Sequence, residues 1–188
     1  MAENLKVTHY NDGTPIPTGY SYSEWSDAET GAYAVYGNAD TYGYLYNWYA
    51  VGTGNLAPDG WHVPTDEEWM ELEMALGMSE SEAQGIGWRG TNQGSQLAGN
   101  PGLWNNSGSL DNNEGFGTSG FDGLPGGYRP GYDGNYISMG YYAYFWSSTD
   151  DDNINVSAWY RDLHFNYSEV YRNGIYKRYG FSVRCLAD

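Results

Sequence analysis

The stretch FWSSTDDDNINVSAWYRDLHFNYSEVYRNGIYKRYGFSVRC, from Phe145 to Cys185, sets the pattern around which we interpret the whole chain. It opens on the apolar pair Phe145-Trp146 and closes on the run Gly180–Cys185. Between these ends Tyr, Asn, Asp, Ser and Arg dominate. Apolar runs are typical of buried strands, and a middle rich in Tyr, Ser and Asn is typical of binding surfaces. We therefore predict that the ends are scaffold and that residues 145–185 carry a ligand-binding region.

The clearest helix signal outside this stretch is the segment Thr65–Trp69. Thr65 followed by Glu68 forms a capping box, and acidic residues in a first turn suit the positive end of a helix. The pattern predicts a helix that ends at Gly77. Because capping accounts for these carboxylates, we assign them no catalytic role.

Two further helical patterns are weaker in sequence. Aromatic residues between Tyr42 and Tyr49 recur on one helical face, which predicts a helix capped by Asp40 or Thr41 and ended by Gly52. A short helix is expected near residues 79–84. The rest of residues 78–120 is rich in Gly, Asn and Ser and predicts long loops pinned by the aromatic residues Trp88, Trp104 and Phe116.

The final third of the chain has the pattern of antiparallel strands. Tyr141–Trp146, Ser157–Phe165 and Phe181–Leu186 are aromatic or alternating runs with turn residues between them. About five short runs after Asp122 predict an antiparallel sheet. With the helical patterns, they predict an α+β fold. No repeat or linker divides the sequence, so we expect residues 1–188 to form one domain.

The composition is aromatic and acidic, with 20 Tyr, 8 Trp and 27 Gly among 188 residues and a net charge of −16. This charge argues against nucleic acid and anionic membranes as partners, because both are bound by Lys and Arg. No apolar run is long enough to span a bilayer, and residues 1–7 do not form a signal peptide. Five of the eight Lys and Arg residues lie in residues 159–188. They either pair locally with acidic residues or contact a partner, since Arg is frequent at binding hot spots.

Metal and nucleophile chemistry has little support in the sequence. Cys185 is the only cysteine, which excludes an intrachain disulfide, and its apolar surroundings predict an inert buried thiol. The three histidines lack metal-ligand spacing. Asp151, Asn153 and Asn155 match alternate positions of a Ca²⁺ loop, but Val156 stands where such a loop needs Gly. We expect an acidic loop tip there and no cofactor, with Ca²⁺ on these three residues as the alternative.

Seven segments follow one another along nearly the whole chain in a recognisable order. They are Met1–Leu5, Tyr10–Pro17, Tyr42–Val51, Gly60–Thr65, Leu124–Arg129, Trp146–Ser148 and Gly180–Cys185. In this order they resemble the Fibrobacter succinogenes major paralogous domain family. The family's pattern usually starts upstream of Met1, so we expect a preceding strand or an export signal to lie outside this sequence.

The resemblance implies a C-type-lectin-like fold of the formylglycine-generating-enzyme kind, in which two helices pack against a small twisted antiparallel sheet with long irregular loops. It also implies a secreted or surface-displayed binding protein of a bacterium or phage. Some members resemble targets of diversity-generating retroelements, which rewrite adenine-containing codons and so turn Asn codons into Tyr, Asp, Ser, His, Ile or Gly codons. Residues 159–179 contain such residues between constant-looking ends.

The enzymes of this fold would need a cysteine pair for copper or a three-histidine iron site, so we expect a binding protein and not an enzyme.

The expected ligand contacts lie in the later half of the stretch, where the charge turns positive. In this prediction Tyr and Trp supply apolar contact area, Arg supplies charge-assisted hydrogen bonds, and Asn and Glu orient the ligand. The predicted contacts are Trp159, Arg161, His164, Asn166, Tyr167, Glu169, Tyr171, Asn173, Ile175, Tyr176 and Arg178. The expected partner is a protein or glycan on another cell or on a phage host. A carbohydrate-binding surface lectin and a structural surface protein are the alternatives.

Overall fold

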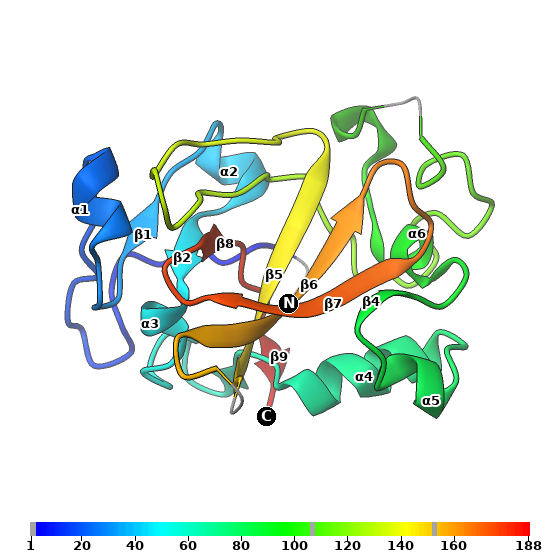
Figure 1. The fold of residues 1–188 in the computed structure, drawn as a ribbon, viewed down its shortest axis with the longest axis horizontal. Coiled ribbons are helices and arrows are strands. Elements are labelled where there is room, and N and C mark those ends of the chain that lie inside the picture. The colour runs from blue at the N-terminus through cyan, green and yellow to red at the C-terminus, as the bar shows by residue number, and fades with distance from the viewer. Residues whose placement is uncertain (1–2, 106–107, 152–153) are drawn as a thin grey trace.

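The tyrosine-rich stretch folds into the largest sheet of an α+β architecture, as the sequence predicts (Figure 1). The computed structural model describes residues 3–105, 108–151 and 154–188. The sheet has four antiparallel strands in the order β4-β7-β6-β5. These are β4 (Gly87–Arg89), β7 (Val170–Tyr176), β6 (Ser157–His164) and β5 (Tyr142–Asp150). The edge strand β4 comes from a region in which the sequence predicts only loops.

A second sheet continues the first along the outer edge of β5. It consists of β1 (Tyr33–Ala34), β2 (Leu45–Asn47) and β8 (Gly180–Phe181), paired antiparallel in the order β1-β2-β8. The Trp146 amide donates to the Ser182 carbonyl at 3.2 Å, which joins the two sheets. A third sheet pairs β3 (Trp61–His62) with β9 (Leu186–Ala187). The expected strand at residues 181–186 is therefore divided between β8 and β9.

The helix that the capping box predicts is α4 (Asp66–Ala75). Glu68 accepts from the Thr65 backbone amide at 2.7 Å, and Gly77 follows the helix with a φ of 101°. In the described part of the chain, every other helix has five residues or fewer. These short helices are α1 (Tyr22–Ser26), α2 (Ala39–Tyr42), α3 (Trp48–Val51), α5 (Glu80–Ala83), α6 (Gln93–Leu97) and the 3₁₀ turn Pro101–Leu103. The structure thus has one substantial helix where two were expected.

The prediction of a single helix across Tyr42–Tyr49 is wrong. Gly43, with a φ of 72°, ends α2, and the fully buried strand β2 follows it. Asn47 then caps α3, because its Oδ1 accepts from the Ala50 amide at 3.2 Å. Pairing with β1 and β8 provides backbone hydrogen bonds and burial that outweigh the local helical pattern.

Two hydrophobic clusters lie on opposite faces of the large sheet. Phe145 and Leu163 pack with Trp69 of α4 on one face, whereas Trp146 packs with Phe181 on the other. Successive side chains of a strand point to opposite faces, so each strand contributes to both clusters. The face toward α4 also holds Trp69 and Glu73, two buried side chains of that helix. The other face packs partly against Phe181 of β8, and it carries the candidate site.

Candidate ligand-binding surface

Buried ion pairs lock one face of the sheet to α4. Arg161 of β6 donates from Nε to Glu73 Oε1 at 2.6 Å and from Nη1 to Asp66 Oδ1 at 2.6 Å. Arg172 of β7 reaches Asp66 Oδ2 at 2.5 Å, and Arg89 of β4 reaches Glu73 Oε2 at 2.8 Å. All five residues are buried. We call this set the ion-pair network, and it ties three strands to one helix.

The electrostatics of the network favour its charged form. Burial raises the pKa of Asp66, but the hydrogen bond from Arg172 and the positive charge of Arg161 outweigh it and hold the pKa below its usual value. Buried charges are tolerated when they are paired and hydrogen-bonded in this way. The network therefore holds the backbone of the central strands in a fixed position.

The network corrects one predicted contact. Arg161 has no exposed surface and faces α4, so it cannot touch a ligand in this structure. Arg161 was predicted as a contact because it lies in the arginine-rich part of the chain and arginine is frequent at binding hot spots. Trp159 also points to this side, with its ring 3.9 Å from the Arg172 guanidinium.

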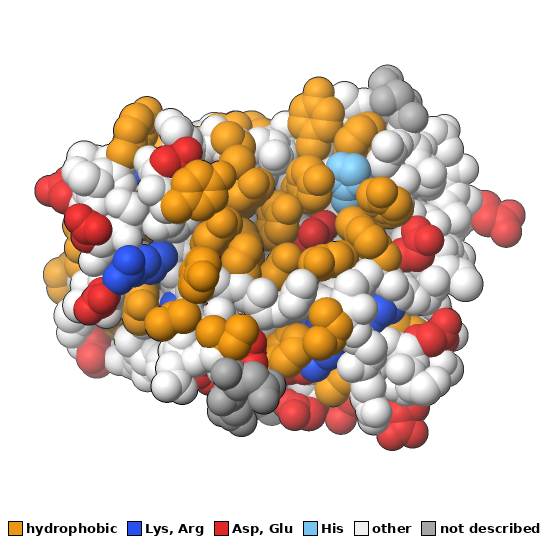
Figure 2. All heavy atoms as spheres, in the orientation of Figure 1, with side chains coloured by type: hydrophobic (Ala, Val, Ile, Leu, Met, Phe, Trp, Pro, Cys, Tyr) orange, Lys and Arg blue, Asp and Glu red, His pale blue; other side chains and the backbone are white. Residues whose placement is uncertain are grey.

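The opposite face of the same strands carries a row of aromatic side chains around one acidic residue. Trp88, Tyr171, Asp162 and Tyr144 are direct neighbours across β4, β7, β6 and β5. Figure 2 shows hydrophobic side chains gathered over these strands, with acidic atoms in the middle of the patch and imidazole atoms beside it. We call this surface the aromatic face. Its members are Trp88, Tyr142, Tyr144, Tyr160, Asp162, His164, Tyr167, Tyr171 and Asn173.

The rings of the aromatic face hold one another in place. Trp88 stacks on Tyr167 with centroids 4.3 Å apart and contacts Tyr171 edge-on at 5.0 Å. His164 lies 4.2 Å from the ring of Tyr142. Trp88 and Tyr167 remain 36% and 42% exposed, so this stack is open to a ligand. Rigid, half-exposed aromatic rings give large contact area at a small loss of side-chain entropy.

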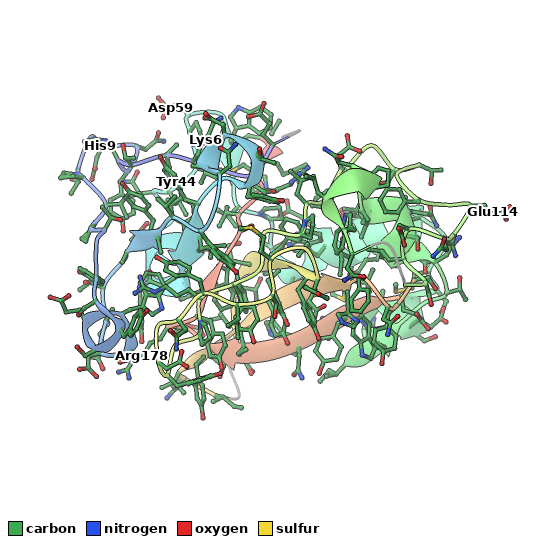
Figure 3. The ribbon with its side chains drawn as sticks, turned by 90° about the horizontal axis from the view of Figure 1, so that it is seen from above. Lys6, His9, Tyr44, Asp59, Glu114 and Arg178 are labelled. Carbon is green, nitrogen blue, oxygen red and sulfur yellow. The ribbon has the colours of Figure 1, made fainter. Side chains whose placement is uncertain are left out.

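A groove of about 520 Å³ lies at the other end of β7. Its aromatic and basic lining includes Tyr49, Tyr132, Tyr176, Arg178 and Tyr179. Arg178 pairs with the exposed Glu29 at 2.7 Å. Figure 3 shows Arg178 on the β7 side of the molecule, away from Lys6 and Asp59. We call this feature the tyrosine groove.

The structure brings together some of the predicted contacts and separates others. His164, Tyr167, Tyr171 and Asn173 share the aromatic face, whereas Tyr176 and Arg178 line the tyrosine groove. The remaining predicted contacts are the exposed Asn166, the half-buried Glu169 and Ile175, and the α4-facing Trp159 and Arg161.

Five members of the aromatic face were not among the predicted contacts: Trp88, Tyr142, Tyr144, Tyr160 and Asp162. The alternation of Tyr142 and Tyr144 with the buried Ala143 could have indicated one exposed side of β5. Trp88 comes from a distant segment, and the register that places it beside Tyr171 has no local signal.

The acidic loop before β6 is only partly described, since Asn153 lies outside the described residues. Lys177 donates to Asp150 Oδ2 at 2.7 Å and to the Asn155 carbonyl at 3.0 Å, which neutralises part of the loop. Across residues 3–105, 108–151 and 154–188 no group of three or more His, Cys, Asp or Glu side chains could hold a metal ion.

Comparisons with known proteins point to one family. The model of the Fibrobacter succinogenes major domain matches residues 1–187. Neither the curated proteins nor the solved structures include a significant match. None of the helices in the described part of the chain is long and apolar enough to cross a membrane.

Proposed function

Because the chain belongs to the Fibrobacter succinogenes major domain family, we propose that it is a non-enzymatic ligand-binding protein displayed outside the cell or on a phage particle. Its ligand is a protein or glycan on another cell surface, and the aromatic face receives it. The observation that carries this proposal is an open, internally stacked set of aromatic rings on strands that the ion-pair network fixes from behind.

The division of labour within the strands supports a binding role. On β6, Arg161 and Leu163 face α4, while Asp162 and His164 face outward. Outward positions with exposed side chains, such as Trp88 and Tyr167, can change with little loss of core contacts, whereas Tyr160 also packs in the core. A binding protein gains from this arrangement, because Tyr and Trp are frequent hot-spot residues and a rigid scaffold lowers the entropy lost on binding.

The same division fits a surface that a diversity-generating retroelement rewrites. In this proposal the outward residues within 145–185 are the variable ones, and the α4-facing residues stay constant.

The fold is C-type-lectin-like. Support for the fold comes from the irregular connections around a small antiparallel sheet and from the paired chain ends, where the Leu5 amide donates to the Val183 carbonyl at 2.8 Å.

A carbohydrate ligand is the second candidate, and the tyrosine groove favours it. Tyr132 and Tyr176 are 66% and 60% exposed at its edge, beside Arg178. Exposed aromatic rings can stack on the apolar faces of sugars, and Arg can donate hydrogen bonds to hydroxyl groups. Binding of glycans that is lost in Tyr132→Ala and Tyr176→Ala, but kept when the aromatic face is altered, would favour this candidate.

The test is a screen of the whole chain against a displayed protein library and a glycan array. We expect selected ligands to bind roughly 30-fold or more weakly to the double variant Trp88→Ala, Tyr167→Ala, because hot-spot truncations cost about 2 kcal/mol or more. Tyr22→Ala is the matched control, since Tyr22 is 60% exposed on α1. Circular dichroism checks that each variant is folded. Ligands that bind both variants like the wild type would refute the aromatic face as the site.

A further inference from the structure

The middle of the aromatic face holds a carboxylate without a partner. Asp162 is 4% exposed, and no hydrogen-bond donor among the described residues reaches its Oδ1 atom. Its neighbours across the sheet are Tyr144 and Tyr171. Tyr160 and His164 flank it along β6 on the same face, as the two-residue period of a strand requires. A buried polar group that is not hydrogen-bonded is rare in folded proteins and calls for an explanation.

The protein's own cations are engaged elsewhere. Arg161 and Arg172 lie on the opposite side of the sheet and bind Asp66. Lys177 binds Asp150. His164 is the nearest basic group, but burial lowers its pKa, so it is neutral near pH 7. Nothing in the described part of the chain therefore neutralises the Asp162 carboxylate.

A second unpartnered atom lies on the same face of β6, two residues further along the strand. The Nδ1 atom of His164 is buried without a hydrogen-bond partner among the described residues, and the residue is only 9% exposed. With its proton on Nε2, this imidazole presents Nδ1 as an acceptor. Asp162 and His164 thus offer two acceptors on one face, and the rings of Tyr144, Tyr160 and Tyr171 surround the carboxylate.

We propose that this arrangement receives the side chain of a lysine from a partner protein. The lysine ammonium donates hydrogen bonds to Asp162 and His164, its charge meets the electron-rich faces of the tyrosines, and its alkyl stem packs on the rings. A compact ammonium with three donors fits two separate acceptors better than the planar fork of an arginine. The net charge of −16 also attracts a basic partner. This inference rests on the proposed function, since it names the ligand group that the aromatic face binds.

Burial gives the site a specific pH dependence. It raises the pKa of Asp162 to about 8. The groups that face this carboxylate are Tyr142 and Tyr144 from β5, Tyr160 and His164 from β6, and Tyr171 from β7. Burial raises the pKa of Tyr142, Tyr144 and Tyr160 above the usual tyrosine value, so these three phenols carry no charge between pH 6 and 8. Burial lowers the pKa of His164, so its imidazole is mostly neutral near pH 7. Binding of the ammonium then requires loss of the Asp162 proton, and affinity should rise up to about tenfold per pH unit in this range.

The experiment measures binding of small probes to the whole chain by nuclear magnetic resonance titration. The probes are n-butylammonium, its neutral analogue n-butanol, a lysine-centred peptide and the same peptide with norleucine. We expect the two ammonium probes to shift the resonances of the aromatic face, with the lysine peptide binding more tightly. Asp162→Asn should weaken ammonium binding roughly 10- to 100-fold, the usual effect of a hydrogen bond to a charged group. Glu114→Gln is the control, because it removes one negative charge far from this face (Figure 3).

Several outcomes would overturn the inference. Equal binding of the lysine and norleucine peptides would remove the role of the ammonium. Unchanged affinity in Asp162→Asn, or an affinity that does not rise with pH, would remove the role of the carboxylate. If instead library ligands depend on Trp88 and Tyr167 but bind Asp162→Asn like the wild type, the inference fails while the proposed function stands.

Discussion

Arg161 and Arg178 make a matched pair for testing the separation of scaffold from surface. Arg161→Met removes two charge-assisted hydrogen bonds of 2.6 Å in the interior. It leaves the buried carboxylates of Glu73 and Asp66 with less positive charge to balance them. Loss of one partner from a buried ion pair typically destabilises by about 3–5 kcal/mol. Arg178→Met removes one exposed pair with Glu29, and such pairs contribute roughly 1 kcal/mol or less. Methionine keeps most of the side-chain length in both variants, so the charge is the main difference.

Urea unfolding followed by tryptophan fluorescence gives both free energies. For a slope of about 2 kcal/mol per molar urea, the Arg161 variant should lose roughly 1.5–2.5 M in its unfolding midpoint, and the Arg178 variant less than about 0.5 M. High salt should leave the difference largely intact, because buried pairs are screened little. A midpoint for Arg161→Met within 0.5 M of the wild type, as a rough limit, would refute the network as the element that holds the strands.

Three further predictions concern stability. The pKa of Asp162 in the folded protein is about 8, above its ordinary value of 3.8. The contribution of Asp162 to folding stability is therefore most favourable below about pH 4 and is lost as the pH rises toward 8. The unfolding free energy of Asp162→Asn, relative to that of the wild type, should therefore increase by up to about 1.4 kcal/mol per pH unit between pH 5 and 7. A difference that stays constant over this range would contradict the prediction. Gly94→Ala should destabilise by about 1–3 kcal/mol in urea, because a Cβ there would overlap the Glu169 carbonyl. A Cβ at Gly102 makes only an ordinary contact with Asn100 Oδ1 at 3.8 Å, so equal midpoints for Gly94→Ala and Gly102→Ala would contradict the close approach. Thr65→Ala should lower the unfolding free energy by about 1 kcal/mol through loss of the α4 cap, and an unchanged melting temperature would count against that cap.

Local chemistry determines which parts of the fold could be predicted. The start of α4 follows from Thr65 and Glu68, which are three residues apart and satisfy each other's backbone groups. The strands β5 and β6 follow from their alternating aromatic pattern. β2 could not be predicted in the same way, because it is held by Tyr33 and Phe181, which lie far from it in sequence.

The contacts of the candidate site likewise fall into those that composition predicts and those that depend on pairing with distant strands. Tyr167 and Tyr171 were predicted from composition, and the structure places them side by side with Trp88. Composition could not separate Arg161 from Arg178, because the direction of a strand side chain depends on the register with distant strands and on the position of α4. Pairing across the sheet also makes Trp88 a member of the surface, although it precedes β6 by a long segment of chain.

Arg161 and Asp162 show what this geometry makes possible. They are adjacent and their side chains point to opposite faces of one strand, so the two groups do not pair with each other. Arg161 is paired with α4, and Asp162 is left with a carboxylate that burial destabilises. A strand can hold such a carboxylate only if interactions elsewhere stabilise it, and the ion-pair network on the other face supplies them. Asp162→Asn should then be more stable than the wild type near pH 7 and bind cationic ligands less tightly, which is the pattern expected of a residue retained for function at a loss of stability.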